Sequence, residues 1–376
     1  MKRRQVLIVV CVAMMLAGAW AFLKSPRDSV LEIAPTEMSV DASAKQYSDL
    51  KQEWERLTFE NYVARAAQQI GATWPLADQI WPGADYGNIN VLFVETNGEN
   101  AWLVTPDGNI VKFPAKDLPS AYRVTGYPFR FTSSEQTLNG IPTLKVEVDS
   151  DLFLGPYKSS EFESLPTSSL LFAFTAHEEF HRVQNTWNVE YTDQEKLIEI
   201  GQDNFAARAQ RYEIIRALRL ALLNPEEETE NLEAAKWWFE AYRNDHPQEY
   251  ELAKSMDILE GAARYFDMAM NVRSVGGFHL SAEELRANYQ RMILTDYTLD
   301  ADSFFGLPDE ESYDIGGIAG VLLEMKDDAT WKDRVEQGTP PLEILLEGYS
   351  ASPQEPSPEV TNLVEEIRHF RSQSGK

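Results

Sequence analysis

The 376-residue chain has a single cysteine, Cys11, which lies in an apolar N-terminal stretch. Without a second cysteine the chain cannot close an internal disulfide bond, and no group of thiolates can bind a metal ion. Thiol chemistry and zinc sites built from cysteine are therefore excluded. Any metal site in this chain must use imidazole or carboxylate ligands.

Positive charge is also scarce. The chain has 34 Lys and Arg residues against 60 Asp and Glu residues, which gives a formal net charge of −26. The cations are scattered, and no basic stripe is present that could follow a phosphate backbone. Nucleic acid is therefore excluded as a partner. The acidic run at 226–230 is interpreted as a solvated loop between helices.

Histidine is rare as well, with five residues in the chain, yet two of them fall in one motif, His177-Glu178-Glu179-Phe180-His181. Residues four apart lie on one face of a helix, so His177 and His181 can present two imidazole nitrogens to a single metal ion. Glu178 is displaced around the helix, where its carboxylate can hold a water molecule. This H-E-x-x-H arrangement is typical of zinc-dependent hydrolases.

The residues around the motif predict a buried helix. Hydroxyl groups at 167–169 can cap its first turn, and the stretch from Leu170 to Ala176 is apolar on nearly every side. Two histidines and two glutamates inside such a helix need partners, because unpaired buried charge is costly. A metal ion supplies one kind of partner, and ion pairs to other helices are the alternative.

A catalytic zinc site has three protein ligands and one open position. The three-histidine pattern H-E-x-x-H-x-x-G-x-x-H is absent, because Gln184 and Trp187 stand where glycine and histidine are needed. None of the remaining histidines has an obvious ligand setting: His246, His279 and His369. A glutamate is therefore expected as the third ligand, and Glu199 and Glu260 compete for that position.

Glu260 is favoured over Glu199 because small residues follow it at once. Gly261, Ala262 and Ala263 remove side-chain bulk, so the helix that carries Glu260 can approach the histidine helix closely. A glycine inside a helix costs about 1 kcal/mol against alanine, which indicates a packing reason for it. The competing interpretation is an exposed glutamate beside a small-residue helix contact.

Together, His177-Glu178-Glu179-Phe180-His181 and Glu260-Gly261-Ala262-Ala263-Arg264-Tyr265 resemble the gluzincin type of zinc metallopeptidase. The resemblance covers about residues 165–270. It implies that His177, His181 and Glu260 bind zinc and that Glu178 is the general base and acid. Glu260 lies further along the chain than the ligand glutamate of many gluzincins, which implies an inserted pair of helices.

Hydrolysis of an amide also requires a second electrophile for the developing oxyanion. Two tyrosines are candidates: Tyr265, five positions after Glu260, and Tyr313, in a segment at 312–317 that we expect to be flexible. Either residue can instead be an ordinary half-buried tyrosine. Arg264 and Asp267 can orient the ligands, although for Asp267 a surface ion pair is the favoured interpretation.

The N-terminus resembles an export signal. Met1-Lys2-Arg3-Arg4 precedes an apolar run at 6–23, and A-x-A sequences occur at 17–21. The run is nearly long enough to span a bilayer, and the charges before it predict an extracytoplasmic body. We therefore expect residues 1–24 to be a signal peptide or a membrane anchor and residues 25–45 to be a linker.

The remaining sequence changes character near residue 166. Strands are predicted at 89–95, 101–104, 110–113, 122–125 and 143–148, after a helix at 47–70. Beyond 166 the chain is mostly helical, with helices predicted at 197–223, 233–243, 250–270, 281–293, 318–325, 342–346 and 358–370. Asn97-Gly98 and Asn139-Gly140 are hairpin turn signals.

These observations predict an α+β fold of the zincin type in one domain at 46–376. A small antiparallel sheet occupies a lobe at about 46–165, and it packs on a helical lobe at about 166–376. The expected function is an exported Zn²⁺-dependent hydrolase that acts on peptides or proteins, with residues 6–23 available for membrane anchoring. The alternatives are a zincin scaffold without catalysis that binds or assembles in the envelope, and a hydrolase of another amide or ester.

Overall fold

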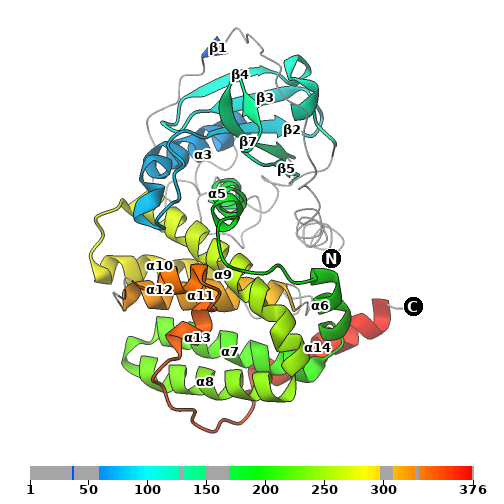
Figure 1. Ribbon diagram of the computed structural model, residues 1–376, viewed down its shortest axis with the longest axis vertical. Helices are drawn as coiled ribbons and strands as arrows, with labels where there is room; N and C mark the ends of the chain where they lie inside the picture. Colours follow the sequence, from blue (N-terminus) through cyan, green and yellow to red (C-terminus); the bar gives the residue numbers. More distant parts are fainter. Residues whose placement is uncertain are drawn as a thin grey trace. The chain divides into compact units, whose positions relative to one another are not determined.

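The computed structural model describes residues 36–37, 59–126, 130–149, 169–296, 308–326, 328 and 330–374. They form a mixed α/β protein with two compact units (Figure 1). One unit comprises the described residues up to Val183 together with Met270–His279. The other comprises Gln184–Ala269 and the described residues from Leu280 onward. The expected signal segment and linker lie almost entirely outside the described residues.

The first unit contains the sheet, whose strand order is β1-β4-β3-β2-β7-β5, with β6 pairing β7. Its strands are β1 (Thr36–Glu37), β2 (Asn90–Glu95), β3 (Asn100–Val104), β4 (Ile110–Pro114), β5 (Phe131–Thr132), β6 (Thr137–Leu138) and β7 (Ile141–Val148). Most neighbouring strands are antiparallel, but β2 and β7 run parallel. The prediction of an antiparallel sheet is therefore wrong for the β2–β7 pair. A parallel pair needs a long connection, and here it contains the intervening strands β3 to β6.

The hairpin turns are confirmed. Gly98 and Gly140 have φ values of 73° and 77°, and Asn139 has φ 54°, which is the left-handed backbone that these turns require. The strand predicted at 122–125 is wrong: the short 3-10 helix η4 (Ser120–Tyr122) ends there, and an extended loop follows. The backbone N–H of Thr125 donates to the buried Glu147 carboxylate, so this loop is fixed by a side chain rather than by strand pairing.

Among the described residues of the first unit, the sheet is accompanied by the helices α3 (Phe59–Thr73) and α5 (Ser169–Gln184, up to Val183). Helix α3 meets the β3–β4 turn so closely that a side chain at Gly71 would lie 2.9 Å from the backbone oxygen of Asp107. The same unit contains the 3-10 helices η2 (Trp74–Gln79) and η3 (Ala115–Asp117) in addition to η4. Of the helix predicted at 47–70, residues 47–58 lie outside the described part of the chain.

The second unit is helical. Its elements are α6 (Gln194–Gly201), α7 (Phe205–Leu223), η6 (Pro225–Glu227), α8 (Glu228–Asp245), α9 (Pro247–Gly276, up to Ala269), α10 (Ala282–Asp296), α11 (Glu310–Met325), α12 (Trp331–Glu336), α13 (Pro341–Leu345) and α14 (Pro358–Ser374). Helices α7 and α8 form a hairpin through η6 (Figure 1). The single helix predicted at 197–223 is two helices, because Asn204 caps a new one by accepting from the N–H of Ala207.

Helix α11 begins earlier than predicted, so the segment at 312–317 is helical rather than flexible. Its glycines allow close packing against α9. A side chain at Gly316 would lie 2.3 Å from the Cα atom of Gly261, and one at Gly320 would lie 2.7 Å from Tyr265 Cβ. Glycine is therefore required here for helix contact, not for a loop. The helix predicted at 281–293 is confirmed as α10, and Ser281 forms a capping box before it by exchanging hydrogen bonds with Glu284.

None of the helices in the described ranges combines the length and apolar character that crossing a membrane requires.

Candidate metal centre

Helix α5 carries the H-E-x-x-H motif, and aromatic contacts hold its apolar side inside the first unit. Phe180 packs edge-on against Trp81 with ring centroids 5.2 Å apart, and Phe174 packs against Phe131 at 6.5 Å. The Tyr86 hydroxyl donates to the carbonyl oxygen of Ala176 at 3.4 Å. These contacts fix the rotation of the helix about its axis.

Glu179 lies at the centre of the motif. As an acidic residue on a buried helix, it needs a hydrogen-bond or ion-pair partner. It is 1% exposed and accepts hydrogen bonds from Ser134 Oγ at 2.7 Å and Arg182 Nε at 2.5 Å. Burial raises the pKa of Glu179, although Arg182 and Ser134 both favour its ionised form. Glu179 is therefore satisfied by an ion pair inside the first unit, on the side of α5 away from the histidines.

His177 and His181 lie one turn apart on the same side of α5. Their ring centroids are 4.9 Å apart with the planes at 82°, so the rings meet edge to face. His177 is buried and His181 is half-buried. Two imidazoles this close can share one cation, as the i, i+4 spacing predicts.

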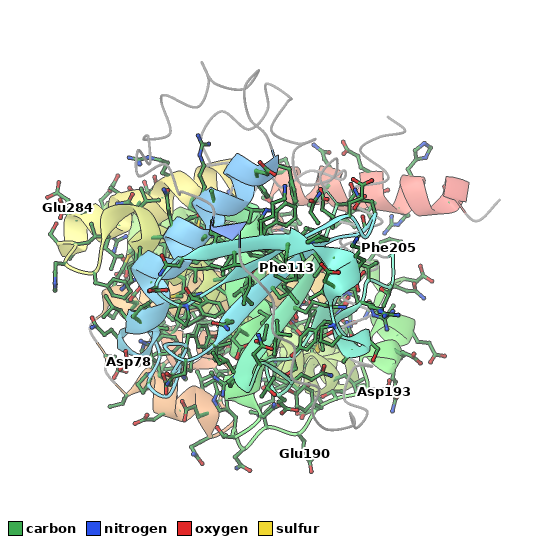
Figure 2. The ribbon with its side chains drawn as sticks, turned by 90° about the horizontal axis from the view of Figure 1, so that it is seen from above. Asp78, Phe113, Glu190, Asp193, Phe205 and Glu284 are labelled. Carbon is green, nitrogen blue, oxygen red and sulfur yellow. The ribbon has the colours of Figure 1, made fainter. Side chains whose placement is uncertain are left out.

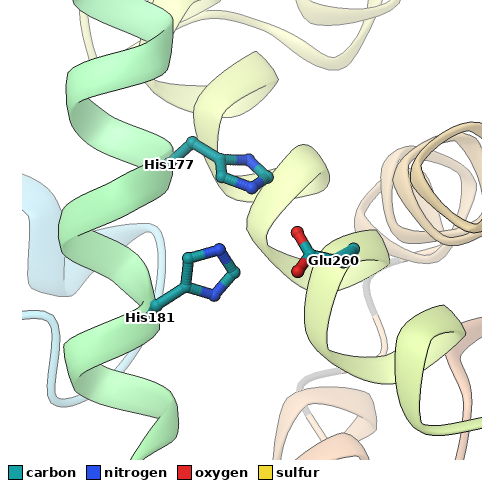
Figure 3. Close-up of side chains that lie close together, drawn as sticks. All are labelled: His177, His181 and Glu260. Carbon is teal, nitrogen blue, oxygen red and sulfur yellow. The ribbon is translucent and has the colours of Figure 1, made fainter. Parts of the chain in front are cut away.

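Glu260 lies on helix α9, and its carboxylate completes the group. One ligand atom from each of His177, His181 and Glu260 lies within 4.8 Å of the other two. In Figure 3 both imidazole rings and the carboxylate turn toward one another. The structure therefore brings together the three residues that the sequence proposes as metal ligands.

The orientation of Glu260 follows from the packing of the residue after it. Gly261 faces α11 at Gly316, where the two backbones meet. Successive residues of a helix are rotated by about 100°, so Glu260 points away from this contact. The glycine was expected to bring α9 close to the histidine helix. That explanation is wrong, because the close approach is made to α11.

Gln184, the last residue of α5, is bonded directly to α9. Its side-chain amide is 2% exposed and donates to the carbonyl oxygen of Leu259 at 2.6 Å. Leu259 precedes Glu260, and Gln184 follows His181 by one turn. The sequence treats Gln184 only as a departure from the three-histidine pattern, and no feature of the chain pattern marks it as a helix-to-helix contact.

A network of buried ion pairs surrounds the N-terminal half of α9. Arg211 donates to both oxygens of Asp257, at 2.7 and 3.3 Å, and to Glu311 at 2.7 Å. Arg208 donates to Glu311 at 2.5 Å and also bonds Glu249. Glu249 and Asp257 belong to α9, so two arginines of α7 fix the helix that carries Glu260.

The other site candidates occupy different environments. Glu178 is half-buried on α5, and Tyr313 is half-buried on α11. Tyr265 is fully buried, with its ring 5.0 Å from that of Trp331. Asp267 is only 2% exposed and accepts from Arg264 at 2.8 Å, so the expected surface pair is wrong.

The rejected ligand candidates lie outside the group. Glu199 is exposed on α6, and His279 and His369 are exposed. His246 is half-buried, with Nδ1 3.1 Å from the side-chain nitrogen of Asn204. Among the described residues, His177, His181 and Glu260 form the group whose ligand atoms converge.

The chemistry of this donor set fits zinc. Two imidazole nitrogens and one carboxylate oxygen form a His₂Glu set, which catalytic zinc uses together with one open position. Ligands that share a tetrahedral zinc at about 2.0–2.1 Å are separated by about 3.3 Å. The observed separations, within 4.8 Å, are therefore small enough for side-chain rotation to close.

Comparison of the chain with models of protein families, with curated proteins and with solved structures found no match.

Proposed function

We propose that this protein is a zinc-dependent hydrolase that cleaves peptide bonds. The observation that supports the proposal is the convergence of His177, His181 and Glu260 next to a glutamate of the H-E-x-x-H motif. Imidazole nitrogens and a carboxylate oxygen are donors that zinc uses in catalytic sites, and here one from each side chain lies within 4.8 Å of the other two.

Each residue has a distinct role in this proposal. His177, His181 and Glu260 would hold the metal ion. When bound, zinc supplies a Lewis acid that lowers the pKa of a water molecule towards about 7. Glu178 accepts the proton of the attacking water and delivers it to the leaving nitrogen. Glu179, held by Ser134 and Arg182, keeps α5 in the rotation that presents the histidines.

The proposal extends to the fold and the compartment. A zincin-like fold is supported by the presence of the sheet and the H-E-x-x-H helix in one unit. An extracytoplasmic location is supported by the N-terminal sequence, with positive residues before the apolar run at 6–23. The proposed substrate is a peptide or a protein.

Metal content tests the ligand assignment. Purified protein dialysed against zinc should retain about one zinc ion per chain, measured by inductively coupled plasma mass spectrometry. Glu260→Gln should weaken zinc binding by more than about 100-fold, because it removes a charged ligand. Glu199→Gln is the matched control, since Glu199 is an exposed glutamate that lies outside the group, and it should bind zinc like the wild type.

Activity tests the role of Glu178. On a mixed fluorogenic peptide library, Glu178→Gln should lower hydrolysis by about 10²–10⁴-fold while zinc content stays at the wild-type level. A wild-type protein without zinc contradicts the proposal. A protein that binds zinc and whose Glu178→Gln variant loses no hydrolysis is instead a scaffold without catalysis.

A further inference from the structure

The loop between α5 and α6 is fixed onto helix α9 beside Glu260. Gln184 at its start bonds the carbonyl oxygen of Leu259. At its end, the Thr192 N–H donates to Ser255 Oγ at 3.2 Å, and the Ser255 hydroxyl donates to Thr192 Oγ1 at 2.5 Å. Ser255 and Leu259 both precede Glu260 on α9, so both ends of the loop are attached within two turns of the metal ligand.

A third bond holds the middle of this loop. The Asn188 N–H donates to the carbonyl oxygen of Glu336 at 2.9 Å. The Trp187 ring, one position earlier, is 8% exposed and belongs to the core. The segment 184–192 is therefore attached to neighbouring helices at three points.

Tyr191 is the large aromatic side chain that this fixed loop leaves exposed. It is 62% exposed, whereas Tyr86, Tyr242 and Tyr265 are almost fully buried. Its acidic neighbours Glu190 and Asp193 are also exposed and lie at the periphery of the molecule in Figure 2. An exposed tyrosine on a rigid loop gains little from packing, so its position calls for another explanation.

The phenol of Tyr191 lies within the electrostatic field of Glu260. The surrounding protein raises the pKa of Tyr191, and the Glu260 carboxylate raises it further. The placement itself rests on contacts, because Thr192, the next residue, is bonded to Ser255, five positions before Glu260 on α9.

We propose that Tyr191 is a catalytic residue of this centre, whose hydroxyl donates a hydrogen bond to the carbonyl oxygen of the scissile peptide bond. The inference rests on the proposed function. When water adds to the carbonyl carbon, the π electrons move to the oxygen, and a donor aimed at that oxygen stabilises the new charge. The phenol keeps its proton throughout, because its ordinary pKa of about 10 makes it a donor at neutral pH.

This assignment differs from the two tyrosines that the sequence suggests. Tyr265 is fully buried against Trp331, and Tyr313 lies on α11 in a helix rather than in a flexible segment. Of these three tyrosines only Tyr191 is largely exposed, and a hydroxyl that donates to the substrate must be accessible to the substrate. The sequence gives no signal for Tyr191, because its neighbourhood depends on bonds from residues at 188 and 192 to distant helices.

The test compares Tyr191→Phe with wild type and with Tyr349→Phe. The first variant removes one hydroxyl from an exposed residue, so folding should be unaffected. The control removes the half-buried Tyr349 hydroxyl, which accepts from Lys326 at 2.9 Å, outside the metal centre. We expect Tyr191→Phe to lower kcat on the peptide library by about 100-fold with KM changed little, and Tyr349→Phe to behave as wild type.

Two readouts do not depend on turnover. Zinc affinity, measured by competition with a chelator, should be the same in Tyr191→Phe and wild type, because Tyr191 is not a ligand. Binding of a mixed-sequence phosphinic peptide, followed by the visible absorption of cobalt-substituted protein, should weaken by about tenfold or more, since its oxygens mimic the charged carbonyl oxygen.

The outcomes separate the two proposals. If wild type binds zinc and cleaves peptides while Tyr191→Phe equals wild type in kcat and in phosphinic peptide binding, the role of Tyr191 is refuted and the hydrolase stands. A normal Tyr191→Phe with a raised KM in Tyr191→Ala also refutes it, because the ring rather than the hydroxyl then matters. If wild type binds no zinc, the proposed function itself fails.

Discussion

Asp257 and Glu260 lie one turn apart on helix α9, yet their surroundings differ in kind. Asp257 receives two hydrogen bonds from Arg211, within a network that also contains Arg208, Glu249 and Glu311. Glu260 instead lies with His177 and His181. Asp257 is bonded to a permanent cation of the chain, whereas Glu260 lies in a group of three side chains whose ligand atoms converge.

The difference separates a structural role from a functional one. A guanidinium is charged at every relevant pH, so Asp257 has a permanent partner in Arg211. Imidazole nitrogens and carboxylate oxygens are metal donors, so the group of His177, His181 and Glu260 has the donor set of a metal site. In the proposed function, helix α9 therefore uses Asp257 to fix its position and Glu260, one turn later, to bind the metal ion.

Replacing Arg211, the permanent cation beside Asp257, should have the largest effect on the stability of the fold. Arg211→Met leaves Asp257 and Glu311 buried without their main partner, which should lower the free energy of unfolding by about 3–5 kcal/mol. Urea denaturation followed by circular dichroism measures this loss of free energy.

Arg216→Met on the same helix is the control. Arg216 is 35% exposed, and its pairs with Glu213 and Glu359 are at 3.7 and 3.4 Å. Its effect should stay below about 1 kcal/mol. If Arg211→Met and Arg216→Met lower the free energy of unfolding equally, the buried pair of Asp257 has no special structural role.

A smaller effect is expected where α5 is bonded to α9. Gln184→Met keeps the side-chain volume but removes the donor to Leu259, so Glu260 is held less well against the histidines. Zinc affinity should fall by about tenfold, the low end for groups that orient ligands, while the protein stays folded. Chelator competition measures the affinity. Gln290→Met is a matched control, since its amide also donates to backbone carbonyls, those of Leu222 and Leu223. If both variants bind zinc equally, Gln184 does not position the site.

The smallest effect concerns an ion pair nearer the surface. Burial alone would raise the pKa of Glu228, but hydrogen bonds from Lys326 and Arg286 outweigh it and lower that pKa. The folded state therefore holds its proton less tightly than the unfolded chain, and the pair stabilises the fold above the unfolded pKa, about 4.3. Glu228→Gln should cost about 0.5–1 kcal/mol at pH 7. Denaturation at several pH values should show this difference shrinking as the pH falls below 4.3. A difference that does not depend on pH would contradict the assignment.

The candidate site could be predicted where it depends on local spacing. His177 and His181 share a helix face wherever their helix lies in the fold. The hairpin turns follow from Asn-Gly sequences, because these residues readily adopt the left-handed backbone that the turns need. The glycine after Glu260 predicts a close helix contact, but its partner Gly316 is more than fifty positions away. Sequence shows that a close contact exists, not which helix makes it.

The missed features share this long-range origin. The parallel pairing of β2 and β7, the bond from Gln184 to Leu259 and the attachment of Thr192 to Ser255 all join segments that are distant in the chain. Their residue types are common in loops and on helix surfaces. The break between α6 and α7 is different, because Asn204 is a local capping signal that the apolar periodicity concealed.

The central claim is that His177, His181 and Glu260 bind one metal ion, and zinc-edge anomalous diffraction from crystals of the zinc-loaded protein tests it most directly. We predict a single strong anomalous peak at about 2.0–2.2 Å from an imidazole nitrogen of each histidine and from a carboxylate oxygen of Glu260. A peak bound by other residues, or none at these three side chains in protein loaded with zinc, would contradict it.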